Sequence, residues 1–146
     1  MNGKIAIRPI KQNDYSFGYY IKKVTLKEYI EKTYGWNTEF QKDSYRKTFN
    51  TENKYIIELD NKKIGWLNYV KKTDEIEIHQ IFILPKDQNK GIGSKIIIDI
   101  INIGKNEHKP IKLQVLKTNI KAKKLYEKLG FIEYEQNNTH YKLKYD

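Results

Sequence analysis

The stretch that most limits the possible folds is residues 75–104, in which a strand pattern, two glycines and a helix pattern follow one another. Residues 75–84 (EIEIHQIFIL) alternate between polar and apolar side chains and then become continuously apolar, which predicts a strand buried on both faces at its end. Residues 94–104 carry isoleucines at helical spacing. The connecting segment, QNKGIG at 88–93, therefore predicts a turn that leads directly into a helix.

A glycine turn at the start of a helix is a candidate anion site. Gly91 and Gly93 carry no Cβ, so the backbone can approach a ligand closely. The first N–H groups of a helix have no partner inside the helix and lie at the positive end of its dipole. The pattern is Gln-x-x-Gly-x-Gly, which is neither a P-loop nor the dinucleotide fingerprint, because no Gly-Lys-Ser/Thr follows and Ile96 occupies the third glycine position.

The remaining patterns predict a mixed α/β domain. Three strands in sequence precede the glycine turn, and a hairpin closes the chain after the last helix. The helix between the strands at 75–84 and 111–116 makes that pair parallel. A length of 146 residues suits a single domain that spans 1–146. Besides those named, we expect strands at 5–10, 55–59, 64–70, 132–136 and 140–145, and helices at 15–32, 38–48 and 119–130.

Composition narrows the function classes. The net charge is +10, but the lysines are spread along the chain and only Arg8 and Arg46 are arginines. Reading of bases favours arginine, so we expect no nucleic-acid partner and attribute the charge to compositional bias or to an anionic cofactor. Without cysteine there is no thiolate metal site, and we expect no metal. No apolar run approaches the ~18 residues of a membrane span, so we expect a cytoplasmic protein without membrane contact.

The densest aromatic segment is residues 34–41, between the first two predicted helices. It includes Trp36, with Glu39 three residues later. One interpretation is a core contact between the two helices. The other is a wall of a substrate pocket, since aromatic rings pack against apolar chains and attract amines. Trp36 and Glu39 are the candidate substrate residues under the second interpretation.

A second motif lies in the helix at 119–130. Asn119 and Tyr126 are seven residues apart and therefore share a helix face, with the small Ala122 between them. The segment Asn-x-x-Ala-x-x-Leu-Tyr-x-x-Leu-Gly-Phe and the upstream Gln-x-x-Gly-x-Gly turn both resemble elements of the GNAT superfamily of N-acetyltransferases. The resemblance covers residues 75–131, and the Trp-x-x-x-x-Gln element at 36–41 also resembles bacterial members of this superfamily whose substrate is undetermined.

This resemblance implies a twisted, mostly antiparallel sheet of about six or seven strands, with helices on both faces and a splayed fourth and fifth strand. It also implies acetyl-CoA as cofactor, with its pantetheine arm in the wedge between those two strands. Tyr126 would protonate the departing thiolate, and Asn119 would bond the pantetheine. The other residues implied to bind the cofactor through their backbones are Ile81, Phe82 and Ile83 along the arm, and Gln88, Asn89, Lys90, Gly91, Ile92, Gly93 and Ser94 around the diphosphate.

The implied reaction is direct attack of an amine on the thioester, with a backbone N–H such as that of Phe82 stabilising the oxyanion. Because amines are mostly protonated at neutral pH, a base must remove a proton. Glu77, 11 residues before Gln88, matches the position of a family glutamate, and His79 is the second candidate on the same strand face. Glu77 can equally be a solvent-facing carboxylate of the strand.

The expected acceptor is a primary amine on a small molecule or a peptide, and the expected state is a monomer or a homodimer. Two alternatives stay open at this point. One is a GNAT-like module that binds coenzyme A without catalysis, against which the presence of Tyr126 argues. The other is a basic nucleic-acid-binding protein, which would need a localised lysine face with exposed aromatics.

Overall fold

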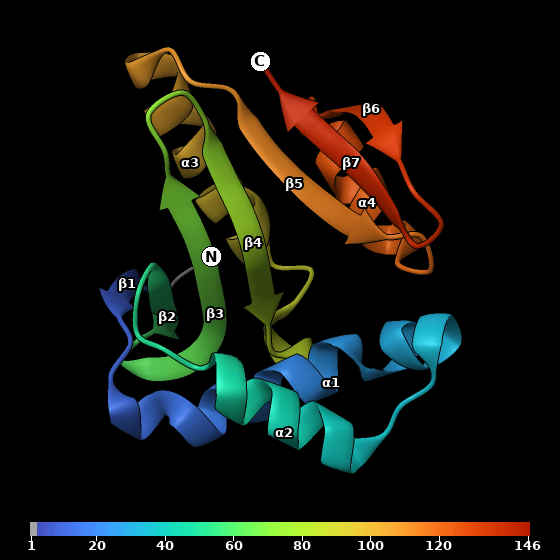
Figure 1. The fold of residues 1–146 in the computed structure, drawn as a ribbon. Coiled ribbons are helices and arrows are strands. Elements are labelled where there is room, and N and C mark those ends of the chain that lie inside the picture. Colours follow the sequence, from blue (N-terminus) through green and yellow to red (C-terminus); the bar gives the residue numbers. More distant parts are fainter. Residues whose placement is uncertain (1–2) are drawn as a thin grey trace.

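The computed structural model describes residues 3–146 as four α-helices around one seven-stranded sheet (Figure 1). Two short 3₁₀ turns, Gln12–Asp14 and Pro85–Asp87, precede α1 and α3. No helix within these residues is long and apolar enough to cross a bilayer. The elements are β1 (Ile5–Pro9), α1 (Tyr15–Tyr34), α2 (Thr38–Thr48), β2 (Lys54–Leu59), β3 (Lys62–Lys71), β4 (Ile76–Ile83), α3 (Ile92–Glu107), β5 (Ile111–Leu116), α4 (Ile120–Lys128), β6 (Ile132–Gln136) and β7 (His140–Tyr145).

The strands lie in the order β1-β2-β3-β4-β5-β7-β6, and every neighbouring pair is antiparallel except β4 and β5. The crossover through α3 makes that one pair parallel, as the sequence predicts. The mixed, mostly antiparallel sheet with helices on both faces confirms the expected fold class. The final hairpin enters the sheet by its second strand, so β7 lies beside β5 and β6 forms the edge.

The sheet is nearly divided in two between β4 and β5. Only three positions pair, Ile76–Ile78 with Ile111–Leu113. Beyond them the two strands diverge, and Figure 1 shows the gap widening toward α1 at the lower end of β4. The expected splay of the fourth and fifth strands is therefore confirmed. On the β5 side of the gap, β7 and β6 continue the sheet.

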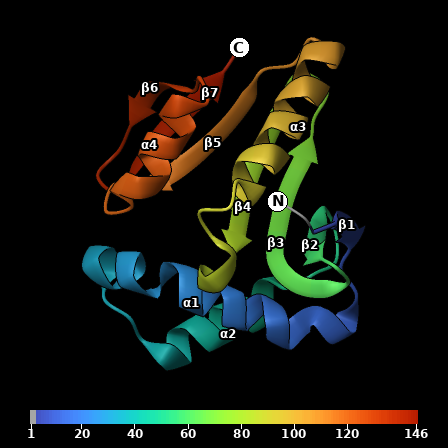
Figure 2. The same ribbon diagram turned by 180° about the vertical axis from the view of Figure 1, so that it is seen from behind.

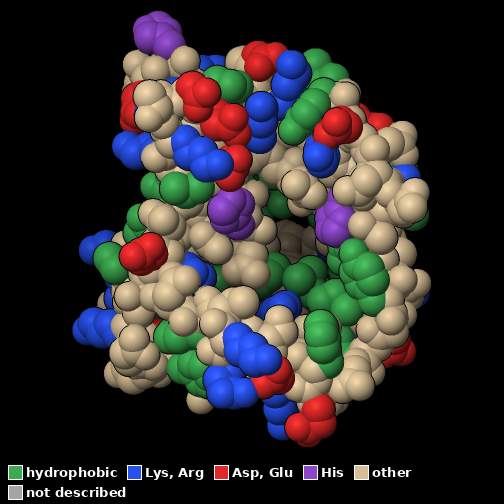
Figure 3. Space-filling model, in the orientation of Figure 1, with side chains coloured by type: hydrophobic (Ala, Val, Ile, Leu, Met, Phe, Trp, Pro, Cys, Tyr) green, Lys and Arg blue, Asp and Glu red, His purple; other side chains and the backbone are tan. Residues whose placement is uncertain are grey.

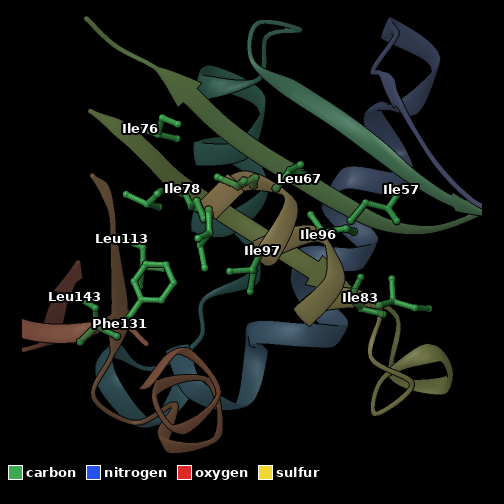
Figure 4. Close-up of a cluster of buried hydrophobic side chains, with 14 of the residues drawn as sticks. Ile57, Leu67, Ile76, Ile78, Ile83, Ile96, Ile97, Leu113, Phe131 and Leu143 are labelled. Atoms are coloured by element: carbon green, nitrogen blue, oxygen red, sulfur yellow. The ribbon is translucent and has the colours of Figure 1, made fainter. Parts of the chain in front are cut away.

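Each face of the sheet has its own core. The larger cluster packs α3 against the sheet and extends to Phe131, which follows α4, and to Leu143 of β7 (Figure 4). Figure 2 shows α3 and α4 covering this face. The smaller cluster packs Ile21 of α1 against Ile56, Trp66 and Phe82 on the opposite face. The alternation of apolar residues along β2 to β4 thus places helices on both sides.

A β-bulge in β4 changes which residues face each side. Asn68 of β3 pairs with Gln80, but the next residue, Tyr69, pairs with Ile78, so His79 is one extra residue in β4. Ile76 and Ile78 before the bulge, and Ile81 and Ile83 after it, consequently belong to the same core cluster. With the simple alternation expected from the sequence, Ile76 and Ile78 would lie on one face of the sheet, and Ile81 and Ile83 on the other.

α3 is longer than the predicted 94–104. It begins at Ile92 and continues through Gly104 to Glu107, and His108 ends it in the left-handed conformation. Gly104 is buried, and a Cβ there would lie 2.5 Å from Ile111 Cδ1. This glycine therefore allows close packing of helix against strand rather than terminating the helix.

The start of α1 is held by ion pairs of Asp14 and not by a side-chain cap. Asp14 holds the N-cap position, but its carboxylate makes no capping bond to α1. It is fully buried, with oxygens 2.9 Å from Arg8 Nη1 and 2.6 Å from Lys63 Nζ. Burial alone would raise the pKa of this carboxyl, but hydrogen bonds from Arg8 and Lys63 outweigh burial and hold its pKa well below the ordinary value. Asp14 therefore ties α1 to β1 and β3.

Candidate active site

A cavity of about 440 Å³ lies at the open end of β4, between α1, α3 and α4. Its lining includes Tyr29 of α1, Ile81 of β4, Gly93 of α3 and Tyr126 of α4. Figure 3 shows a hollow in the middle of this face, with hydrophobic side chains inside it and histidines at its rim. The cavity has the size and the mixed lining of a small-molecule site.

The turn after β4 forms one end of the cavity. Asn89 and Gly91 have positive φ angles of 62° and 81°. The first helical bond of α3 runs from Lys95 N–H to the Gly91 carbonyl, and within residues 3–146 the amides of 89–94 donate no hydrogen bond. A Cβ built on Gly91 would meet no atom within 4 Å. Unused amides around open space at a helix N-terminus can hold an anion.

Two neighbours of this turn have contacts that the sequence did not suggest. Gln88 donates from its side chain to the Ile83 carbonyl at 2.8 Å, which fixes the turn to the end of β4. Asp87 is buried and lines the cavity, with one oxygen 3.5 Å from Lys90 Nζ and the other without a partner in residues 3–146. Asp87 thus holds Lys90 beside the turn, an arrangement that no sequence pattern indicates beyond the closeness of the two residues along the chain.

The open edge of β4 provides further backbone groups. Leu84 N–H donates to the Ile64 carbonyl on β3. Since antiparallel strands bond at every second residue, the Phe82 amide also points to β3, whereas the amides of Ile81 and Ile83 point to the cavity. This register corrects the expectation that the Phe82 N–H faces the wedge. The N–H that faces the wedge is that of Ile81. Phe82 also lines the cavity, but its N–H points to β3.

Asn119 and Tyr126 approach the cavity from α4, as their spacing predicts. Asn119 Oδ1 accepts from Ala122 N–H at 3.2 Å and so caps the helix, which leaves its amide nitrogen for the cavity. Gly130 ends the helix in a positive-φ conformation, with Phe131 N–H bonded to the Tyr126 carbonyl and Gly130 N–H bonded to Glu127. This Schellman arrangement carries Phe131 into the core and fixes Tyr126.

The Tyr126 ring packs edge-on against Phe131, with ring centroids 5.7 Å apart. Its hydroxyl has no hydrogen-bond partner in the described chain, although the side chain lines the cavity. Burial raises the pKa of Tyr126 to about 12. The phenol therefore stays protonated at neutral pH and can serve as a proton donor inside the cavity.

Glu77 and His79 line a separate hollow of about 330 Å³, whose lining also includes Lys112–Gln114 of β5. His79 Nε2 lies 3.0 Å from Glu77 Oε1, and Lys72 Nζ lies 3.0 Å from Glu77 Oε2. The two sequence candidates are thus brought together. His140, at the start of β7, lines the same hollow and was missed, because its position depends on the pairing of β7 with β5.

The charges around Glu77 make it a poor base. Hydrogen bonds from His79 and Lys72 lower the pKa of the Glu77 carboxyl to about 2. A carboxylate with so low a pKa has little tendency to take a proton from an amine. Because Glu77 accepts from Nε2 of His79, a neutral His79 ring carries its free electron pair on Nδ1.

Trp36 and Glu39 lie away from the cavity. Glu39 is exposed and lines a separate hollow between α1 and α2. Trp36 is half-buried beneath Lys27, whose Nζ lies 5.9 Å from the ring centroid. The α1 residues that do line the cavity are Val24, Thr25, Leu26, Glu28 and Tyr29, and the irregular apolar pattern of this helix gave no sign of that role.

The sequence matches the model of the Acetyltransferase (GNAT) family over residues 20–131. The chain belongs to this family. The match covers well over half of the chain and includes both the glycine turn and the Asn119–Tyr126 helix, which are the two motifs brought together around the cavity. The resemblance seen in the sequence is therefore confirmed.

Two relatives and one solved structure illustrate the range of similarity. An uncharacterised N-acetyltransferase of Methanocaldococcus jannaschii is 28% identical over 125 residues, which are 80% of this chain and 50% of that protein, so the chain spans half of that relative. A spermidine N(1)-acetyltransferase of Vibrio cholerae is 29% identical over 146 residues, covering 91% of this chain and 82% of that protein. The crystal structure of PaiA N-acetyltransferase from Thermoplasma acidophilum with coenzyme A has a TM-score of 0.78 at 16% identity, covering 97% and 98% of the two chains.

Proposed function

We propose that this GNAT chain transfers the acetyl group of acetyl-CoA to a primary amine. The observation that carries the proposal is the position of Tyr126, whose unpartnered hydroxyl lines the same cavity as the unused amides of the glycine turn. The protonated phenol of Tyr126 suits the sulfur end of a thioester cofactor, and the amides of the glycine turn suit a diphosphate at its other end. The complex of PaiA from T. acidophilum with coenzyme A supports the same choice of cofactor.

The residues present fit this cofactor. The amides of residues 89–94 and the open space above Gly91 would receive the diphosphate, and Lys90 adds a positive charge beside them. The amide of Ile83 would bond the pantetheine arm as an added strand does. The Asn119 side-chain nitrogen would bond the arm from the opposite wall.

Bound acetyl-CoA supplies an acetyl thioester, whose carbonyl an uncharged amine attacks with release of a thiolate. We assign the Ile81 N–H to the carbonyl oxygen, because it is a fixed donor on the open edge of β4. Tyr126 gives its hydroxyl proton to the leaving sulfur. Its raised pKa keeps that proton in place until negative charge develops nearby.

We assign the role of base to His79 and not to Glu77, the first candidate from the sequence, and Glu77 becomes the residue that orients His79. The pKa of Glu77 near 2 argues against Glu77 itself, whereas its hydrogen bond to Nε2 leaves Nδ1 of His79 as an acceptor. His79 is an extra residue in a β-bulge, a feature that often redirects a side chain next to an active site.

The acceptor is a primary amine of a small molecule or a peptide. The relative from V. cholerae is named for spermidine, which makes a polyamine one member of any acceptor panel. Simple amines, amino acids and peptides with free N-termini complete it. The parts of the cavity wall that would touch the acceptor come from α1, where the family motifs give no guidance.

The test is a calorimetric titration with acetyl-CoA, followed by an amine panel in which release of the free thiol is measured. We expect micromolar binding and thiol release that depends on both acetyl-CoA and amine. Gly91→Trp, which projects a ring into the anion cradle, should abolish binding. Absence of binding at millimolar acetyl-CoA by a folded protein would overturn the proposed function.

A further inference from the structure

A second cavity, of about 170 Å³, lies on the other face of β4, between the sheet and helices α1 and α2. Figure 1 shows these helices crossing the lower ends of β3 and β4. Phe82 lines both this cavity and the cofactor cleft, so a single residue of β4 separates them. The volume corresponds to several water molecules, since each occupies about 30 Å³ in the liquid.

The charged side chains that line this cavity are all cationic. Two lysines, Lys22 of α1 and Lys54 of β2, line it, and no carboxylate does. Gln80 Oε1 accepts from Trp66 Nε1 at 3.0 Å, which turns the Gln80 amide nitrogen away from Trp66 as a free donor. Asn68 adds a second side-chain amide.

The two lysines are not neutralised within residues 3–146. Lys22 makes no ion pair or hydrogen bond there, although its side chain is half-buried. Lys54 Nζ donates to Asn50 Oδ1 at 2.9 Å, and the charge of Glu52 acts on the pKa of Lys54 without forming an ion pair with it in the described residues. Burial lowers the pKa of both ammonium groups, a cost that a bound anion would remove.

We propose that this cavity binds a small anionic group, a carboxylate or a phosphate, between Lys22, Lys54 and the Gln80 amide. The group can belong to the acceptor, in which case the inference rests on the proposed function and makes the substrate an amine that also carries an acid. It can equally be a free inorganic anion. Both sources use the same donors, and the positive lining disfavours a polycation such as spermidine in this cavity.

The direct test uses Trp66 as a reporter. Trp36 and Trp66 are the only tryptophans, and Trp36 lines neither cavity, so Trp36→Phe leaves one fluorophore at the wall of the site. This protein is titrated with sodium phosphate, sulfate and acetate at constant ionic strength, with chloride as the balancing anion. We expect a saturable change in Trp66 fluorescence with phosphate or acetate in the millimolar range.

Matched variants in the Trp36→Phe background separate this site from the general charge of the protein. Lys22→Met and Lys54→Met should each raise the anion concentration at half-saturation by about tenfold, as expected for the loss of a charge-assisted hydrogen bond. Lys23→Met removes the same charge from an exposed neighbour and should leave the titration unchanged. Lys22→Gln serves if circular dichroism shows that Lys22→Met is unfolded. No saturable signal with any anion, or the same titration in the Lys22 variant, would overturn the proposal.

A pair of acceptor comparisons identifies the source of the anion. Thiol release is measured with glycine against glycinamide, and with O-phosphoethanolamine against ethanolamine. A preference for the acidic amine that disappears in Lys22→Met places the anion on the acceptor. Phosphate binding that no amine displaces identifies a free anion. Because the fluorescence titration needs no acetyl-CoA, a failure of the proposed acetyl transfer leaves it interpretable.

Discussion

The two ends of the β4–β5 pair differ in what holds them together. At the joined end, Ile76–Ile78 pair with Ile111–Leu113, and Ile76, Ile78, Ile111 and Leu113 are all buried in one core. At the open end, the strands diverge and the amides of Ile81 and Ile83 face a cavity. The joined end contributes stability, whereas the open end leaves backbone donors for a ligand. The candidate site therefore arises where the sheet is left incomplete.

The largest effect is expected at the open end, from Tyr126→Phe. Loss of the proton donor should lower kcat by about 10²–10⁴-fold, which is about 3–5 kcal/mol in activation free energy. Acetyl-CoA affinity, measured by calorimetry, should change little. Tyr145→Phe is the matched control, because Tyr145 packs on the same Phe131 ring at 5.8 Å but pairs with Ile111 at the joined end. Equal activity of Tyr126→Phe and the wild type would remove the assigned role of Tyr126.

The joined end is best broken by Ile76→Ala. Ile76 is fully buried, so its truncation should cost about 3 kcal/mol of unfolding free energy, within the usual range for an aliphatic core residue. Urea unfolding followed by circular dichroism measures this loss. Ile81→Ala at the open end should cost less stability, since Ile81 is half-buried, but should raise KM for acetyl-CoA. The opposite ranking would contradict the division of roles between the two ends.

Gly91→Ala tests the anion cradle with a smaller expected effect. An added methyl group should weaken acetyl-CoA binding about tenfold, since it intrudes on the space of an anion and strains a positive-φ position. Gly35→Ala is the control for a positive-φ glycine outside the cavity, because Gly35 also has φ of 81° and no atom within 4 Å of a built Cβ, yet it lies between α1 and α2. Gly35→Ala should lose more stability than Gly91→Ala, because ψ is 161° at Gly35, whereas Gly91, with ψ of 5°, is in the left-handed region that alanine tolerates better. Only Gly91→Ala should lose affinity.

The smallest effect concerns the Glu77 ion pairs near the joined end. The hydrogen bonds from His79 and Lys72 depress the folded-state pKa of Glu77 to about 2, so the ionised carboxylate stabilises the fold above its unfolded pKa. This contribution should be lost as the pH falls from about 4.5 toward about 2. Because the partners are half exposed to solvent, we expect only about 1 kcal/mol at pH 7.

The measurement is urea unfolding of the wild type and Glu77→Gln at pH 7 and pH 3. The stability difference between the two proteins should shrink at the lower pH. Glu39→Gln is the control, since Glu39 is exposed and makes no ion pair in the described part of the chain. A difference that stays constant between the two pH values would show that the pKa of Glu77 is not depressed.

The sequence predicted the order of the elements and the principal motifs, because these depend on local spacing. The glycine turn, the cap at Asn119 and the helix end at Gly130 are all set by neighbours within a few residues. The position of His140 could not be predicted, since it follows from β7 rather than β6 pairing with β5.

Two further features were hidden for the same physical reason. The low pKa of Glu77 depends on where Lys72 and His79 place their nitrogens, which alternation along a strand does not give. The distance of Trp36 from the cavity depends on how α2 turns back after Gly35. Both features depend on tertiary structure, so they cannot be predicted from composition or periodicity.

The extra residue at His79 reverses which residues of β4 face each side of the sheet. Before the bulge the even-numbered residues face the larger core, and after it the odd-numbered residues do. The isoleucines of both halves therefore reach the larger core, while Phe82 reaches the smaller one. Over evolutionary time such a strand should accept exchanges of side chains far more readily than a change of length. A one-residue deletion in β4 upstream of Ile81 would place apolar side chains on the wrong face of the sheet, and it would also turn the amides of Ile81 and Ile83 away from the cavity.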